Sequence, residues 1–376
     1  MLQATSKILL RKGFRRPTVV LDADRARANI RRMADRADQA GALFRPHFKT
    51  HQSGAVAVWF RDAGVDRITV SSLDMAEHFA GFGWRNITVA LLHNPRETRR
   101  AVGLAAQLAS AGGGLGLVCD DPRVAGQLAA ALSDPTDIWL KIDTGYCRTG
   151  IPWSDGGRLD EVLDACGGRA VPVGLLTHAG HSYHVGDGGS VRKIAAETIA
   201  RLTAARAACK RDDLLLSFGD TPCCSLSRDL SDCDEIRPGN FVFYDLMQLQ
   251  IGSCRSEDLA AAVVCPVLGV YPERRQAVIH GGAVHLSKES LTRPDGGREY
   301  GRLGTVTPDG FGAIVPDATL VSLSQEHGVV QFDGSEMPEL APGDMVLVWP
   351  VHSCLVCDLS RDQMAEPVLI GAEAPL

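Results

Sequence analysis

Lys49 lies near the end of a short apolar run, in the sequence RPHFKTH of residues 45–51. This pattern is typical of a buried strand whose end reaches the active-site face of a barrel. A lysine amine held out of water at such a place can attack a carbonyl carbon and form a Schiff base. A lysine at the rim of a barrel can instead pair with a carboxylate, and position alone does not decide between the two.

His352 and Cys354 lie in the apolar run of residues 346–356. If this run is a strand, residues i and i+2 point to the same face, so the imidazole and the thiolate can converge on one ion. Two protein ligands leave positions open for water and substrate, as a Lewis-acid site requires. A lone His-x-Cys pattern also occurs in ordinary protein cores, so two packed core residues are the alternative.

His178, His181 and Tyr183 follow a run that we predict to be a strand ending at Thr177. They should therefore border the same pocket as Lys49. A neutral histidine near pH 7 can take a proton from a substrate hydroxyl. Either histidine could be the base, with the other orienting it.

The elements that position these residues alternate from about residue 17 between short β-branched runs and helical periodicity, which is clearest in 25–40 and 191–210. This alternation is typical of parallel strands joined by right-handed crossovers, and it predicts a (β/α)₈ barrel over residues 17–250. An open doubly wound sheet is the alternative. The predicted strands are 18–21, 44–48, 68–71, 87–92, 116–119, 138–142, 173–177, 214–218 and 241–244.

The character of the sequence changes after about residue 250, where helical periodicity fades and turn signals separate β-rich runs. We predict a second, mostly β domain over residues 251–376, joined by residues 1–16. Its predicted strands are 263–271, 276–280, 319–323, 329–332 and 345–351.

Composition limits the class of protein. The formal net charge is −6 and basic residues form only local clusters, so nucleic acid is not an expected partner. The sequence has no apolar stretch of membrane-spanning length and no signal-peptide pattern, so we expect a cytoplasmic protein without a membrane partner. The eleven cysteines are scattered rather than arranged as a framework, and we expect them to be reduced.

Several linked motifs carry a family resemblance. Besides 45–51, they are IDTGYCRTG at 142–150, LTHAG at 176–180, GDTP at 219–222, EIRPGN at 235–240 and HSC at 352–354. In this order they resemble the alanine-racemase-like (fold type III) enzymes that use pyridoxal 5'-phosphate (PLP), and more narrowly the D-threonine aldolase and D-serine dehydratase family. The resemblance covers nearly the whole chain and implies that Lys49 carries PLP.

The resemblance extends to further cofactor residues. A phosphate dianion needs several backbone N–H donors in glycine-rich turns, such as those that Gly219, Thr221, Gly239 and Asn240 supply. Arg237 matches by motif the racemase arginine that faces the pyridine nitrogen. The remaining cofactor-binding residues that we expect are His47, Arg148, Tyr183 and Tyr244.

The resemblance also implies a divalent metal at His352 and Cys354, and the sulfur ligand favours zinc over magnesium, with manganese also possible. We predict a PLP- and metal-dependent lyase, a homodimer that cleaves D-β-hydroxy amino acids as a D-threonine aldolase does, with His181 or His178 as the base. The alternative is dehydration of the D-serine type, in which Lys49 takes the Cα proton and the metal helps the hydroxyl to leave. An amino-acid racemase and a non-catalytic PLP-binding protein are weaker alternatives.

Overall fold

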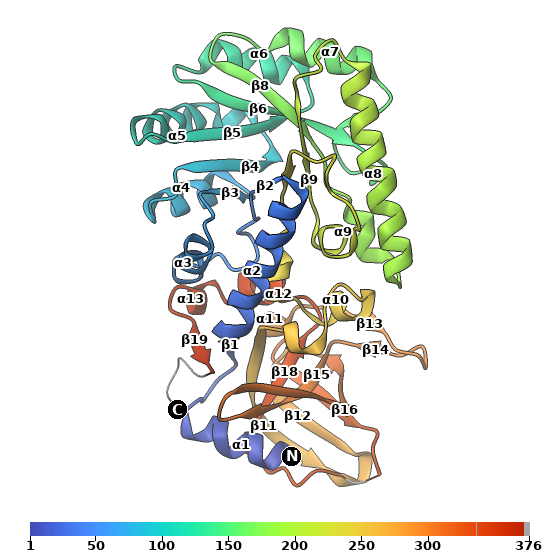
Figure 1. Ribbon diagram of the computed structural model, residues 1–376. Helices are drawn as coiled ribbons and strands as arrows, with labels where there is room; N and C mark the ends of the chain where they lie inside the picture. The colour runs from blue at the N-terminus through green and yellow to red at the C-terminus, as the bar shows by residue number, and fades with distance from the viewer. Residues whose placement is uncertain (336, 372–376) are drawn as a thin grey trace. The chain divides into compact units, whose positions relative to one another are not determined.

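The computed structural model describes residues 1–335 and 337–371. Its contacts divide the chain into two compact units that interleave along the sequence (Figure 1). Unit 1 comprises residues 1–31, 50–59 and 240–376, and unit 2 comprises residues 32–49 and 60–239. These boundaries differ from the predicted division at residue 250, because short segments near the N-terminus pack with the C-terminal half of the chain.

Unit 2 is a parallel barrel. Its strands run in the order β2-β10-β9-β8-β6-β5-β4-β3, with β7 beside β6. The segment after β2 forms a parallel bridge from His47 to Thr69 in β3, which brings the two ends of the sheet together. The predicted (β/α)₈ fold class is confirmed. The strands are β2 (Leu43–Phe44), β3 (Arg67–Val70), β4 (Asn86–Leu92), β5 (Gly114–Cys119), β6 (Thr136–Asp143), β7 (Ile151–Pro152), β8 (Ala170–Leu176), β9 (Leu215–Phe218) and β10 (Glu235–Ile236).

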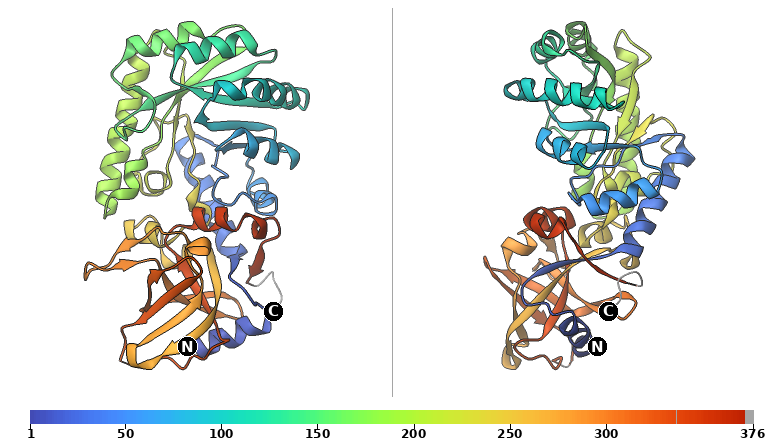
Figure 2. Two further views of the ribbon diagram at one scale, coloured as in Figure 1. Left: turned by 180° about the vertical axis from the view of Figure 1, so that it is seen from behind. Right: turned by 90° about the vertical axis from the view of Figure 1, so that its left-hand side faces the viewer.

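Helices surround these strands on the outside (Figures 1 and 2). In α5 the buried residues Ala101, Leu104, Ala105 and Leu108 recur at helical spacing, so one apolar stripe faces the sheet. The crossover helices of this unit are α4 (Leu73–Gly81), α5 (Thr98–Ser110), α6 (Pro122–Ala131), α7 (Gly156–Ala165), α8 (Gly188–Ala208) and α9 (Thr221–Leu226), while α2 (Ala23–Ala40) and α3 (Gly54–Asp62) run across the unit boundaries.

Unit 1 is a mostly antiparallel β structure, as predicted for the C-terminal region. Its sheet runs β12-β17-β16-β15-β18-β11-β1-β19, and β12 also pairs with β11, so that six of these strands close into a ring. The strands are β1 (Thr18–Asp22), β11 (Ala261–Tyr271), β12 (Gln276–His280), β15 (Gly301–Thr307), β16 (Gly310–Leu323), β17 (His327–Phe332), β18 (Met345–Pro350) and β19 (Val368–Ile370). Helix α1 (Leu2–Arg11) packs against β15 and β18.

Three strand predictions for the barrel are wrong in detail. Residues 18–21 do form a strand, β1, but it pairs with β11 and β19 in unit 1. Residues 241–244 lie in and after the 3-10 helix η3 (Asn240–Val242), and the barrel strand of that region is the earlier β10. The strand predicted over 44–48 is regular only at Leu43–Phe44.

No helix among the described residues is long and apolar enough to cross a membrane. No disulfide joins any two of the eleven cysteines, all of which lie among the described residues.

Candidate active site

Lys49 follows a firmly anchored piece of backbone in unit 2. The Phe48 ring is fully buried, with its centroid 4.8 Å from that of Phe60 and 5.0 Å from those of Phe79 and Trp84. The Phe48 N–H donates to the Thr69 carbonyl at 2.9 Å. The Lys49 side chain itself is exposed to solvent, so the expectation that it is buried is wrong. The buried residue at this position in the chain is Phe48.

His178 follows β8 and has a defined tautomer. Its Nδ1 lies 2.8 Å from the Gly219 carbonyl oxygen, which can only accept, so Nδ1 carries the proton and Nε2 keeps its lone pair. Burial lowers the pKa of His178 well below its usual value, and the charges of Lys49, Lys141 and Arg148 lower it further. His178 is therefore a neutral imidazole at pH 7, with the lone pair on Nε2.

His181 lies in the 3-10 helix η2 (Gly180–His184). Its ring stacks on that of Tyr146, with centroids 6.0 Å apart and an interplanar angle of 27°. The Tyr146 ring also meets the His178 ring edge-on, at a centroid distance of 6.0 Å. Burial, followed by the charge of Arg201, lowers the pKa of His181. The buried His181 Nδ1 has no hydrogen-bond partner among the described residues, so this nitrogen is available to a bound group.

The loop after β6 presents Tyr146 and Arg148. The Asp143 carboxylate accepts the N–H groups of Gly145 at 2.9 Å and Cys147 at 3.0 Å, which folds the loop back over the strand end. The Arg148 guanidinium lies over the Tyr146 ring, 4.9 Å from its centroid. Tyr146 was not among the predicted site residues, although it stands inside a motif that carried the resemblance.

Lys141, on β6, is a further residue that the sequence analysis missed. Only 6% of the surface of Lys141 is exposed to solvent. Burial lowers its pKa to about 7, and the charges of Arg237 and Arg148 add to this effect. Together with Lys49, these side chains make one positively charged cluster at His178, which we call the cationic cluster: Lys49, Lys141, Arg148 and Arg237. An anionic ligand would relieve the repulsion among them.

The turns after β9 and β10 lie close together. Arg237 donates from Nε to the Ser217 hydroxyl at 2.6 Å and from Nη2 to the Thr177 carbonyl. A Cβ atom on Gly219 would lie 3.0 Å from the Arg237 backbone, so glycine permits this approach. Two weaker contacts complete the region: the Thr221 N–H donates to the Tyr183 hydroxyl and the Gly239 N–H to the Thr221 hydroxyl, each at 3.3 Å.

His352 and Cys354 lie together in unit 1, though not on a strand. Strand β18 ends at Pro350, His352 is the N-cap residue of α12 (Ser353–Leu359), and Cys354 lies in the first turn of that helix. The i and i+2 strand argument is therefore wrong. The helix start nevertheless brings the imidazole within hydrogen-bonding contact of the sulfur.

Polar groups of unit 1 surround the sulfur of Cys354. The Thr50 hydroxyl lies 3.2 Å from Sγ, and the Asn240 amide donates to Sγ at 3.4 Å and to an Asp245 carboxylate oxygen at 2.6 Å. Burial opposes a charge on His352, but Cys354 and Asp245 outweigh it and raise the pKa of His352 to about 9. A divalent ion could replace the extra proton, so the donor set fits a metal.

Two predicted cofactor residues, Asn240 and Tyr244, belong to unit 1. The Asn240 amide is directed toward Asp245, Ser353 and Cys354. Tyr244 is buried in unit 1 with a backbone φ of +48°, and its N–H donates to the Asn240 carbonyl at 2.8 Å.

Two family models match the chain. The alanine racemase N-terminal domain model matches residues 21–246, which is more than half of the sequence. The chain belongs to this alanine racemase family. A second model, described as "Putative serine dehydratase domain", matches residues 260–364 of this alanine racemase family member.

Curated relatives are similar over most of their length. A D-threo-3-hydroxyaspartate dehydratase of Delftia sp. strain HT23 is 31% identical over 353 residues, covering 90% of each chain. A D-serine dehydratase of Dictyostelium discoideum is 27% identical over 376 residues, covering 92% of each chain. Both relatives are named as dehydratases of D-amino acids. This member of the alanine racemase family is thus a lyase, and the family resemblance inferred from the motifs is confirmed.

Solved structures agree on the fold. The D-threo-3-hydroxyaspartate dehydratase from Delftia sp. HT23 superposes with a TM-score of 0.84 at 28% identity, covering 96% of each chain. One further structure of that dehydratase is a cysteine-to-alanine mutant in the metal-free form, with a TM-score of 0.82, 28% identity and coverage of 92% and 93%. D-threonine aldolase from Filomicrobium marinum has a TM-score of 0.72 at 20% identity, covering 91% of this chain and 89% of the aldolase, and supports the fold alone.

Proposed function

We propose that this protein is a PLP-dependent dehydratase of D-β-hydroxy amino acids, with D-threo-3-hydroxyaspartate and D-serine as the candidate substrates. The observation that carries the proposal is the 31% identity with a D-threo-3-hydroxyaspartate dehydratase over 90% of both chains. The predicted aldolase activity has weaker support, because the aldolase neighbour is only 20% identical.

The cationic cluster supports PLP as the cofactor. Burial, and after it the positive charge of the neighbouring side chains, lowers the pKa values of His178 and Lys141, so an anion that carries a phosphate fits there. We propose that Lys49 holds PLP covalently, with Gly219, Thr221 and Gly239 near the phosphate and Arg237 at the pyridine ring. When bound, PLP acts as an electron sink for the substrate α-carbon.

The protein's own groups then divide the proton transfers. We propose that the Lys49 amine removes the Cα proton of the substrate. Neutral His178 offers Nε2 as an acceptor for a substrate proton, because Nδ1–H is engaged by Gly219. His181, stacked on Tyr146, is the second candidate base. His352 and Cys354 would hold a divalent ion, which would supply Lewis acidity for the departure of a hydroxyl.

Product analysis tests the proposal. Dehydration removes water and gives a 2-oxo acid and ammonia, whereas aldol cleavage gives glycine and an aldehyde. We expect the purified protein with PLP and Zn²⁺ or Mn²⁺ to convert D-threo-3-hydroxyaspartate or D-serine to a 2-oxo acid and ammonia, and to leave the L-isomers unchanged. Glycine and acetaldehyde from D-threonine as the main products would overturn the dehydratase assignment in favour of the aldolase.

The matched control is Lys49→Ala. This variant should lose activity and also the visible absorption of lysine-bound PLP, because the proposed covalent attachment is removed. A borohydride-fixed PLP adduct at another lysine of the wild-type protein would show that Lys49 is not the attachment site. The expected homodimer stays a prediction, which light scattering of the same preparation tests.

A further inference from the structure

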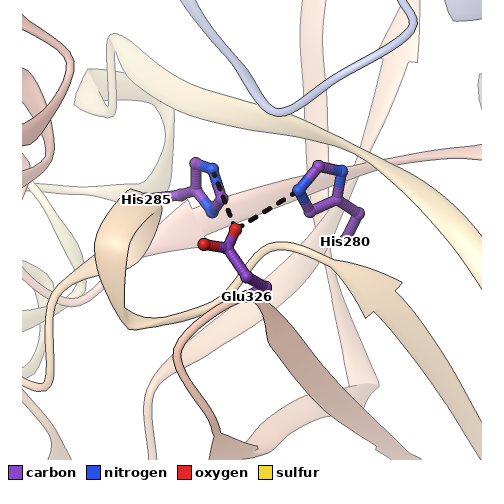
Figure 3. A group of neighbouring side chains, drawn as sticks. All are labelled: His280, His285 and Glu326. Carbon is purple, nitrogen blue, oxygen red and sulfur yellow. Dashed lines mark ion pairs between the residues drawn. The ribbon is translucent and has the colours of Figure 1, made fainter.

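Three side chains of unit 1, none of them assigned above, face one another on the surface (Figure 3). They are His280 at the end of β12, His285 in the short helix α11 (Ala283–Leu286) and Glu326 in the turn before β17. A Glu326 carboxylate oxygen lies 3.5 Å from His280 Nε2 and 3.9 Å from His285 Nε2. One possible ligand atom from each of the three residues lies within 4.8 Å of the other two. We call this group the His–His–Glu cluster.

The backbone around the His–His–Glu cluster is fixed. The N–H groups of Gly281, Ala283 and Val284 donate to the carbonyls of Glu326, Ser324 and Gln325, at 3.0, 2.9 and 3.2 Å. A Cβ atom on Gly282 would lie 2.2 Å from the Gln325 carbonyl oxygen, so only glycine allows the two segments to approach this closely. Residues 280–285 and 324–326, far apart in sequence, therefore hold the three side chains on one rigid support.

The side-chain distances do not suit direct hydrogen bonds. Both histidine–glutamate separations exceed the usual N–H···O range of 2.7–3.2 Å. Ligands about 2.0–2.1 Å from a tetrahedral ion are separated from one another by roughly 3.3 Å. A small rotation of each ring toward the carboxylate would bring the three groups to that spacing.

We propose that the His–His–Glu cluster binds a borderline transition-metal ion of the Zn²⁺ type. Two imidazoles and one carboxylate form a ligand set that such ions favour, and a fourth position stays open to water. The side chains of His280, His285 and Glu326 are 34%, 20% and 46% exposed, so the ion can enter from solvent. Binding through His285 Nε2 moves the ring proton to Nδ1 and gives up only the long 3.4 Å contact from the Gly282 N–H.

This ion is distinct from the one proposed at His352 and Cys354. The two ligand sets share no residue, and the His–His–Glu cluster contains no sulfur. Helix α11, which carries His285, packs against α12, which begins at the proposed catalytic ligands. An ion that cross-links β12, α11 and the 324–327 turn therefore stabilises the support of α12 without entering the chemistry.

Zinc stoichiometry tests the proposal without reference to activity. The PLP-loaded protein, freed of metal by chelation, is dialysed against limiting free Zn²⁺ and its bound zinc is measured. Cys354→Ala should retain one equivalent, and a second change of His280→Ala or Glu326→Gln should remove it, with affinity falling at least about tenfold. The result is independent of the proposed dehydratase function, because no turnover is measured.

The matched control is His327→Ala, which removes an exposed imidazole directly opposite His280 in the β12–β17 register. In the Cys354→Ala background, the His327→Ala change should leave one equivalent of zinc bound. Circular dichroism of each variant establishes that it is folded, and His285→Ala replaces any variant that is not. Two results would overturn the proposal. One is that Cys354→Ala binds no zinc, and the other is that one equivalent of zinc stays bound when His280, His285 and Glu326 are replaced one at a time.

Discussion

A buried lysine such as Lys141 is costly to a protein at neutral pH. Its pKa falls from the ordinary 10.5 to about 7, through burial and then through Arg237 and Arg148. A depressed lysine pKa means that the native state binds fewer protons than the unfolded chain between these two values. The free energy of unfolding is therefore highest above about pH 10.5, and it decreases as the pH falls toward 7. The pKa shift of Lys141 corresponds to a loss of at most about 5 kcal/mol of unfolding free energy.

Lys141→Met should remove this penalty. We expect the variant without cofactor to gain free energy of unfolding over the wild type at pH 7, and the gain should shrink as the pH rises toward 9.5. Urea unfolding followed by circular dichroism at both pH values measures the difference. The variant should also bind PLP more weakly, because it removes a charge from the cationic cluster. A gain that is equal at both pH values would contradict the assigned pKa.

Sequence patterns singled out Lys49, His178 and Arg237 as candidate site residues because each stands in a short motif with its own chemistry. Lys141 stands directly before such a motif, but its importance depends on burial and on Arg237, which is far away in sequence. A one-dimensional pattern cannot provide either quantity. The His–His–Glu cluster was missed for the same reason, since its members meet only through the pairing of β12 with β17.

At the scale of elements, β2, β9 and β10 are joined by a buried polar network. The Glu235 carboxylate accepts from Arg45 Nε at 2.5 Å and from the Ser217 hydroxyl at 2.6 Å, and Ser217 in turn accepts from Arg237. Both β2 and β10 are only two residues long, so few backbone hydrogen bonds hold them. The network therefore stabilises the part of the barrel that carries Arg237.

Glu235→Ala should destabilise the barrel strongly. It leaves the guanidinium of Arg45 buried without its partner, which typically costs 3–5 kcal/mol. The urea midpoint measures this loss, and a lower PLP affinity should accompany it because Arg237 loses its orientation. Arg100→Ala is the matched control: it breaks exposed ion pairs with Asp74 and Glu77 and should cost less than about 1 kcal/mol. Equal losses in the two variants would contradict a structural role for the network.

Local pattern predicted most strands, but not always their partners. Residues 18–21 have the apolar run of a strand, yet their hydrogen bonds go to β11 and β19 instead of the barrel. The two-residue β10 is too short to produce a period, whereas the apolar run at 241–244 folds as a 3-10 turn. The run containing His352 and Cys354 changes from strand to helix between the end of β18 and the start of α12, which hydrophobicity alone does not register.

At the scale of the whole molecule, the residues proposed to hold PLP and those proposed to hold the catalytic ion belong to different compact units. Lys49, Gly219, Thr221, Arg237 and Gly239 lie in unit 2, whereas His352 and Cys354 lie in unit 1. Each set is supported by hydrogen bonds within its own unit, such as Arg237 to Ser217 and Asn240 to Cys354. We therefore expect that the two cofactors can be removed separately.

Chelation should stop turnover while the visible absorption of bound PLP and the far-ultraviolet circular dichroism stay unchanged. The two proposed ligands are only two positions apart in sequence, so the ion cross-links no distant elements and contributes little to the fold. His352→Ala should reproduce the chelated state, with activity and metal affinity both lost and PLP retained. Added Zn²⁺ or Mn²⁺ should restore the chelated wild type but not the variant. Release of PLP from His352→Ala, or unfolding of that variant, would mean that the pair supports structure rather than chemistry.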